Sequence, residues 1–304
     1  MPRFVVCLLL LLAGVAQART LEVGANKPFA TPSAAAAVAR DGDRIAIHSG
    51  VYVDCAVWSA HNLTIEGVGD AGSVTIADKT CQGKALFVTV GDGITIRNLT
   101  LAGARVADGN GAGIRAEGQN LTVDGVRFIG NQDGILTGTV GGSLTVRNSL
   151  FERNGACLAA CAHGIYAGRL DSVRVENSHF IDTREGHHIK SRARQTDIIG
   201  CIIEDGPNGT ASYEIDLPHG GGLLARGNTI TKGPKSGNHG TIVSLGAEGA
   251  LWPSAEILIE DNIVRNEGSW STYFVSNLSP APAILRGNTS TGSVKPLRGA
   301  GAVR

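Results

Sequence analysis

The stretch from residue 160 to residue 220 concentrates side chains that can transfer protons or neutralise carboxylates. Its densest phrase, residues 185–192, reads Glu-Gly-His-His-Ile-Lys-Ser-Arg. Lysine, histidine and tyrosine can each act as a general acid or base when neighbouring charges bring the pKa toward the working pH. We therefore expect the catalytic residues to be Lys190, His188, Tyr166 and Arg192.

This combination of side chains suits chemistry on an acidic sugar. Breaking or epimerising a uronate begins with removal of the weakly acidic C5 proton, and the adjacent carboxylate must be neutralised by cations or hydrogen bonds. Lys190, Arg192 or a bound Ca²⁺ could neutralise it, and the sequence leaves the presence of a metal open. The residues expected to bind substrate are Arg115, His163, His187, Glu214, Asp216 and His219.

The same charges are compatible with two other functions. A glycoside hydrolase needs two carboxylic acids at a defined separation, and Glu214 and Asp216 are the candidates. A non-catalytic polysaccharide-binding, surface or envelope protein would also carry such charges, because opposite charges on neighbouring strands stabilise a sheet modestly. Lys190 opposite Asp216 would then be a structural pair.

A repeated strand pattern predicts the elements that position these residues. A short apolar phrase ending in Asn, Gly or Asp recurs with a period of roughly 23 to 34 residues, which is typical of a solenoid. Each copy leads into a second and then a third apolar strand, so we expect an all-β, single-stranded parallel β-helix with three strands per coil. The Asn and Gly residues should form corners with left-handed backbone angles. The copies lie at 63–67, 94–98, 121–125, 144–148, 173–177, 198–200, 224–227, 257–261 and 284–287.

Equivalent residues of successive coils should stack about 4.8 Å apart and form ladders. If the isoleucine of each third strand points inward, its two neighbours point outward. Of the adjacent histidines we expect His188, rather than His187, to face solvent. The predicted outward ladders are Arg115, Leu136, Tyr166, Lys190, Asp216 and Val243, with Gly113, Gly134, Gly164, His188, Glu214 and Thr241 beside them.

The N-terminus has the features of an export signal. Arg3 precedes an apolar run, and the segment closes on Ala16-Gln-Ala18. We expect a signal peptide at 1–18, one β-helix domain at 19–304, and a periplasmic or extracellular protein. That run is too short to cross a bilayer and no later run is long enough, so membrane insertion is not expected.

Charge and cysteine content limit the partners and the compartment. Lys plus Arg and Asp plus Glu are equal at 27 each, so no general attraction to nucleic acid is expected. We expect a monomer whose partner is a polysaccharide. In an oxidising compartment the expected disulfides are Cys55 to Cys81 and Cys157 to Cys161, with Cys201 a buried thiol.

The start of the mature chain reads as an extended strand at 21–24, a helix within 32–40 that would cap the stack, and a first coil from 42 to 67. In this order it resembles the pectin-lyase-like right-handed β-helix superfamily, and the resemblance covers essentially the whole mature chain. It implies right-handed winding. The superfamily includes polysaccharide lyases, hydrolases, epimerases and proteins without catalysis, so it implies a fold more than an activity.

One segment resembles a subfamily. Residues 185–191 are similar to the Glu and Lys-Ser segment of the alginate lyase and chondroitinase B family. That resemblance implies that Lys190 is a base and that Glu185 helps to hold calcium. The family then has Leu-Arg-His-Gly with a catalytic arginine, whereas this chain has Pro218 at the arginine position.

Overall fold

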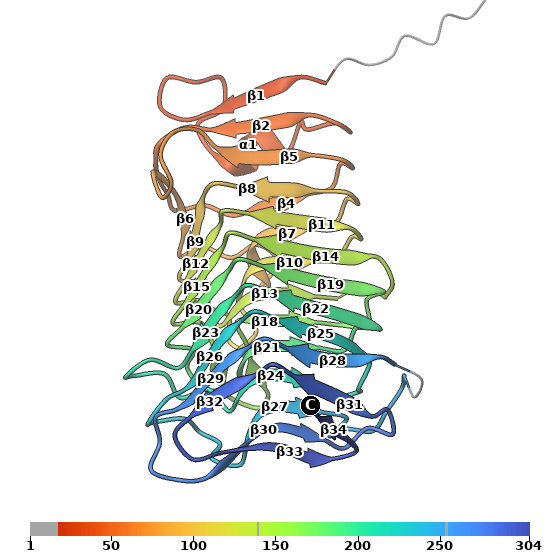
Figure 1. The fold of residues 1–304 in the computed structure, drawn as a ribbon. Coiled ribbons are helices and arrows are strands. Elements are labelled where there is room, and N and C mark those ends of the chain that lie inside the picture. Colours follow the sequence, from red (N-terminus) through yellow and green to blue (C-terminus); the bar gives the residue numbers. More distant parts are fainter. Residues whose placement is uncertain (1–17, 139, 253–254) are drawn as a thin grey trace, which may run out of the picture.

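Parallel strands stacked into a solenoid make up nearly all of the protein, as the computed structural model shows (Figure 1). The structure describes residues 18–138, 140–252 and 255–304, so nearly all of the predicted signal peptide lies outside it. The strands form three parallel sheets of 12, 10 and 10 strands, named here sheets A, B and C. From β5 onward the chain passes through sheets A, B and C in turn.

Sheet A contains β1 (Thr20–Val23), β2 (Arg44–Ile47), β5 (Thr64–Gly67), β8 (Thr95–Arg97), β11 (Leu121–Asp124), β14 (Ser143–Arg147), β19 (Ser172–Glu176), β22 (Gln195–Ile199), β25 (Gly222–Arg226), β28 (Ile257–Glu260), β31 (Ala283–Arg286) and β34 (Gly301–Val303). Sheet B contains β3 (Gly50–Tyr52), β6 (Val74–Ala77), β9 (Thr100–Ala102), β12 (Arg127–Ile129), β15 (Leu150–Glu152), β20 (His179–Ile181), β23 (Ile202–Glu204), β26 (Thr229–Lys232), β29 (Ile263–Asn266) and β32 (Thr289–Thr291). Sheet C contains β4 (Ala56–Trp58), β7 (Ala85–Thr89), β10 (Ala112–Ala116), β13 (Asp133–Thr137), β18 (Ile165–Ala167), β21 (His187–Ser191), β24 (Tyr213–Leu217), β27 (Thr241–Leu245), β30 (Thr272–Asn277) and β33 (Val294–Gly299).

The predicted corners are present between sheets A and B. Asn98, Asn148 and Asn177 have φ values of 53°, 52° and 46°, and Gly125 has a φ of 64°. These left-handed angles are the reason that Asn and Gly end the repeated phrase, because other side chains adopt them at an energetic cost. The sequence period therefore follows from the turn that each coil requires.

The interior of the solenoid is filled by side chains that stack from coil to coil. Phe128, Phe151 and Phe180 occupy equivalent positions of sheet B, and successive ring centroids lie 4.5 Å apart. Neighbouring positions of sheets A and C contribute isoleucine, leucine and valine to the same buried core. This regular packing fixes the register of sheet C, on which the predicted ladders lie.

The only helix of the described chain is shorter than predicted. It is α1 (Pro32–Ala36), whereas the sequence indicated helix as far as residue 40. Thr31 precedes it and its hydroxyl accepts a hydrogen bond from the Ala34 backbone N–H at 3.3 Å, while Pro32 starts its first turn. The helix packs against β1 and β4 at the N-terminal end of the stack (Figure 1).

Both predicted disulfides are present. Cys55 is bonded to Cys81, and Cys157 is bonded to Cys161 across a small antiparallel hairpin of β16 (Ala156–Cys157) and β17 (Cys161–Ala162). Cys201 is buried, and burial raises the pKa of its thiol to about 11, so it is a core residue as predicted. Within the residues that the structure describes, no helix is long and apolar enough to cross a membrane.

Candidate active site

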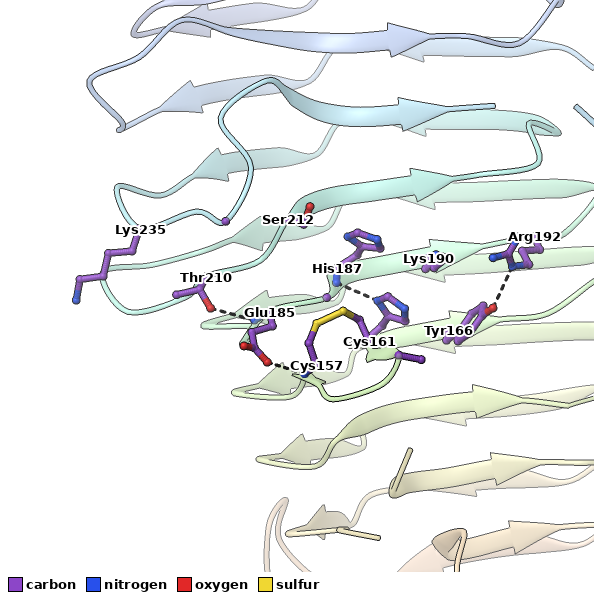
Figure 2. Close-up of a pocket in the computed structure, with 14 residues that line it drawn as sticks. Cys157, Cys161, Tyr166, Glu185, His187, Lys190, Arg192, Thr210, Ser212 and Lys235 are labelled. Carbon is purple, nitrogen blue, oxygen red and sulfur yellow. Dashed lines mark hydrogen bonds between the residues drawn. A yellow bond between two sulfur atoms is a disulfide. The ribbon is translucent and has the colours of Figure 1, made fainter. Parts of the chain in front are cut away.

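A cavity of about 840 Å³ opens on the outer face of sheet C, beside β18, β21 and β24 (Figure 2). The disulfide-closed hairpin of Cys157 and Cys161 forms one wall, and the loops that lead into β21 and β24 form another. The strands are in the predicted register, with Tyr166 beside Lys190 and Lys190 beside Asp216. Three of the expected site residues therefore occupy one ladder.

Two cations surround the aromatic ring of Tyr166. Arg192 Nε donates a hydrogen bond of 3.0 Å to the Tyr166 hydroxyl oxygen, as the dashed line in Figure 2 shows. Lys190 Nζ and the Arg192 guanidinium lie 5.6 Å and 5.7 Å from the ring centroid. The Tyr166 hydroxyl is thus fixed by Arg192, and both cations lie close to its ring.

Two carboxylates flank the Lys190 side chain. Lys190 Nζ lies 3.6 Å from Asp216 Oδ2 and 3.4 Å from Glu248 Oε1, and the Lys190 side chain is only 12% exposed. Glu248 also pairs with Arg192, whose Nη2 is 2.7 Å from Glu248 Oε2. Burial alone would raise the pKa of Glu248, but the Arg192 hydrogen bond and the Lys190 charge outweigh burial and lower it. Glu248 is thus an anion bound by two cations.

His163 and His187 line the cavity as neutral imidazoles. Their rings stack with centroids 4.8 Å apart, and Nδ1 of each accepts a backbone N–H from the following coil, at 3.0 Å for His163 and 3.2 Å for His187. Burial, reinforced by the positive charge of Lys190, lowers the pKa of His187 to about 3. With Nδ1 occupied by a donor, the proton of each neutral ring resides on Nε2.

Asp216 is almost fully buried beside these groups. Its Oδ2 lies 3.5 Å from His187 Nε2, and the next residue of its ladder is Ser244. Burial raises the pKa of Asp216 to about 6, although the charge of Lys190 and a hydrogen bond from Ser244 act in the opposite direction. Its carboxyl therefore changes charge within a mildly acidic pH range.

Asp216→Asn is expected to change how stability depends on pH. Because the folded-state pKa of about 6 exceeds the unfolded value near 3.8, the folded protein retains the proton longer, and stability is lost as pH rises between these values. Relative to the variant, the wild type should lose up to about 3 kcal/mol across this window. Thermal unfolding at pH 4 and pH 7 measures the difference, and parallel curves for the two proteins would contradict it.

The predicted orientation of His188 is wrong. The structure places His187 in the cavity and buries His188 completely inside the solenoid, where Nδ1 lies 2.8 Å from Thr183 Oγ1 and Nε2 lies 3.2 Å from Asp205 Oδ1. A side chain enclosed in this way cannot contact a polymer in the cavity. His188 is therefore a core residue in this structure, contrary to its expected catalytic place.

Glu214 also points inward instead of outward. It is fully buried, and its carboxylate lies 3.3 Å from Lys232 Nζ, which is equally buried. Burial raises the pKa of Glu214 well above its usual range, while the charge of Lys232 acts against this. The predicted contact between Glu214 and substrate is therefore excluded by the fold, as is its pairing with Asp216 in one catalytic site.

Of the remaining predicted residues, His219 lies with the cluster around Arg192 and Arg115 lies outside it. His219 belongs to the cluster, since its Nε2 accepts a hydrogen bond of 2.7 Å from Arg192 Nη1. Arg115 does not, because Leu136 separates it from Tyr166 along the ladder and it does not line the cavity. Arg115 lies instead near Glu117, with Nε 3.9 Å from the carboxylate.

The sequence did not indicate Glu248 or Ser244. Glu248 follows β27 in a loop that shows no repeat, and only its distance from Lys190 reveals it. Ser244 was missed because the predicted ladder continued from Asp216 to Val243, whereas the structure aligns Val243 with the inward-facing Ile215. This shift of one residue places the hydroxyl of Ser244, rather than the apolar side chain of Val243, beside Asp216.

The residues that could bind a metal are dispersed. In the described part of the chain, no three His, Cys, Asp or Glu side chains are arranged to hold a metal ion. Glu185, to which the subfamily resemblance assigns a calcium-binding role, accepts a hydrogen bond of 2.5 Å from the Cys157 backbone N–H (Figure 2). The hairpin wall and the β21 loop are linked through this contact.

Comparison with known proteins identifies the class of fold. No family model and no curated protein matches the sequence. Among solved structures, an alginate lyase from Paenibacillus sp. str. FPU-7 superposes with a TM-score of 0.69 and 18% identity, over 93% of this chain and 99% of that one. A pectin methylesterase from Aspergillus niger superposes with a TM-score of 0.50 and 18% identity, over 90% and 86% of the two chains. The protein is a parallel β-solenoid, consistent with the pectin-lyase-like superfamily.

Proposed function

We propose that this protein acts on an acidic polysaccharide and cleaves it by β-elimination at a uronate residue, with the cavity on sheet C as its active site. The observation that carries this proposal is the meeting of Tyr166, Lys190 and Arg192 in one pocket, with Arg192 hydrogen-bonded to the Tyr166 hydroxyl and Lys190 close to the same ring. The superposition with a solenoid that is named as an alginate lyase supports it.

The contacts suggest distinct roles for the side chains. The Tyr166 oxygen, which accepts a hydrogen bond from Arg192 Nε, removes the C5 proton of the uronate. Arg192 neutralises the carboxylate on the same carbon and stabilises the charge that develops there, while the neutral rings of His163 and His187 line the same cavity. Lys190, which lies between two carboxylates in the free protein, contacts the same uronate carboxylate and donates a proton to the adjacent glycosidic oxygen as the C4–O bond breaks.

An epimerase would use the same first step. After removal of the C5 proton, protonation from the opposite face gives the C5 epimer instead of chain cleavage. The two groups of this site that can transfer a proton, Tyr166 and Lys190, are neighbours in one ladder on the same sheet. This arrangement favours elimination over epimerisation, because in an elimination both proton transfers can occur on one side of the sugar.

The proposal predicts that the wild-type protein generates C4=C5 double bonds from a polyuronate. Ultraviolet absorbance of the unsaturated uronate measures this on alginate, polygalacturonate and glycosaminoglycans, with and without Ca²⁺. We expect a continuous rise on at least one polymer. A polymer that is bound without any rise in absorbance would instead favour the non-catalytic function, or an epimerase if NMR detects inverted C5 centres.

Further properties belong to the same proposal. We infer that the protein is exported, as its two disulfides suggest, and that it acts as a monomer. We also infer a right-handed winding with three strands per coil, and a capping role for α1 at the open N-terminal end.

A further inference from the structure

Glu248 occupies the position between the two cations that the proposed function assigns to the reaction. Its two oxygens divide between them, with Oε2 2.7 Å from Arg192 Nη2 and Oε1 3.4 Å from Lys190 Nζ. A uronate carboxylate is the same chemical group. The free protein thus already contains an anion of the size and charge that the cluster would bind in a substrate.

The backbone beside Glu248 is fixed, while its side chain has room to move. The Glu248 N–H donates to the Pro218 carbonyl at 2.8 Å, and Leu251 N–H donates to the His219 carbonyl at 3.0 Å. The Glu248 side chain is 46% exposed, in contrast to 12% for Lys190 and 16% for Arg192. Exposed side chains change rotamer within nanoseconds, so Glu248 can leave the two cations without any movement of the loop.

We infer that Arg192 and Lys190 form a subsite for one uronate carboxylate, and that Glu248 fills this subsite until an acidic sugar displaces it. The inference rests on the proposed function, and it specifies which group of the substrate meets which side chains. When the sugar binds, its carboxylate takes over the contacts of Glu248, and the Glu248 carboxylate moves into water.

This exchange has a consequence for specificity. A neutral sugar has no charge with which to replace the two ion pairs of Glu248, so it cannot compensate for the free energy lost when Glu248 is displaced. An acidic sugar replaces one carboxylate by another. The apparent affinity for the acidic sugar is reduced by the fraction of molecules in which Glu248 occupies the subsite, and removing the Glu248 charge should recover that loss.

Glu248→Gln is therefore expected to tighten the binding of polyuronates. The variant is compared with the parent protein by calorimetry on oligomers of alginate and of polygalacturonate, with Tyr166→Phe present in both to prevent turnover. If Glu248 occupies the subsite nine-tenths of the time, the dissociation constant should fall about 10-fold. Exposed Glu256, which lies beside sheet A, provides the control, and Glu256→Gln should leave the dissociation constant unchanged.

The outcomes separate the two proposals. Tighter binding of uronate oligomers by Glu248→Gln, without new binding of a neutral glucan oligomer, supports the subsite. Uronate binding that is unchanged or weaker in Glu248→Gln, with an unaltered melting temperature, overturns the subsite and leaves the proposed function standing. If neither protein binds any uronate oligomer, the proposed function itself fails and the subsite fails with it.

Discussion

Lys190→Ala is expected to lower the rate of polyuronate cleavage by a factor of about 10² to 10⁴, the usual contribution of a positioned general acid or base. The substitution removes the proton donor and one of the two cations beside Tyr166. Tyr166→Phe, which deletes a single oxygen atom, should have an effect of the same order. The measurement is the initial rate of ultraviolet absorbance at saturating polymer.

A lysine elsewhere on sheet C provides the matched control. Lys295 lies on β33 with Nζ 5.3 Å from the ring centroid of Tyr273, so it also combines a lysine with a tyrosine but lies outside the cavity. Lys295→Ala should retain the wild-type rate. Equal losses in Lys190→Ala and Lys295→Ala, or full activity of Lys190→Ala, would place the chemistry elsewhere on the protein.

The fold could be predicted because each coil repeats the same physical requirement. Each corner needs a residue with a left-handed backbone conformation, so Asn or Gly occurs there in the sequence. Asn98, Asn148 and Asn177 adopt the predicted angles. A strand that buries one face has apolar residues at every second position, because successive side chains point to opposite faces. Because neighbouring coils repeat the same pattern, an ambiguous alignment in one coil can be resolved from the coils beside it. The register of Tyr166, Lys190 and Asp216 therefore followed directly from the repeat.

The orientation of His188 could not be obtained from alternation alone. The position before each inward isoleucine faces the interior of the solenoid, where a Cβ on Gly134 or Gly164 would approach the ring of Phe151 or Phe180 within 3.4 Å. Further along sheet B, Ile203 and Ile230 take the place of the phenylalanines. The smaller side chains leave space for His188 and Glu214. The end of the phenylalanine series was the one signal in the sequence that these two residues turn inward.

Glu248 could not be predicted for a different reason. It lies 58 residues from Lys190 in a loop without any repeat, and the contact between them depends on how residues 246–251 follow the chain at 217–220. Periodicity determines which strands are neighbours, but it contains no information about the path of an irregular loop. The residue proposed to regulate access to the subsite is therefore found only in three dimensions.

Lys232→Met is expected to destabilise the protein by about 3 to 5 kcal/mol at neutral pH, because it leaves the buried Glu214 carboxylate without its partner. Burial raises the pKa of Glu214, and loss of Lys232 should raise it further. A carboxyl with a raised folded-state pKa is least costly to bury when it is protonated, so the destabilisation should shrink as the pH falls. Thermal and urea unfolding at acidic and neutral pH measure this dependence.

The double variant Glu214→Leu/Lys232→Met tests whether the pair serves stability or position. Replacement of a buried ion pair by apolar residues is often neutral or stabilising, so the double variant should regain most of the stability that Lys232→Met loses. Lys232 Nζ also donates to the Ser212 carbonyl at 3.1 Å, and Ser212 lines the cavity. If the pair positions this wall, the stable double variant will bind uronate oligomers more weakly than the wild type. Restored stability with unchanged binding would show instead that the interior charges and the active site are independent.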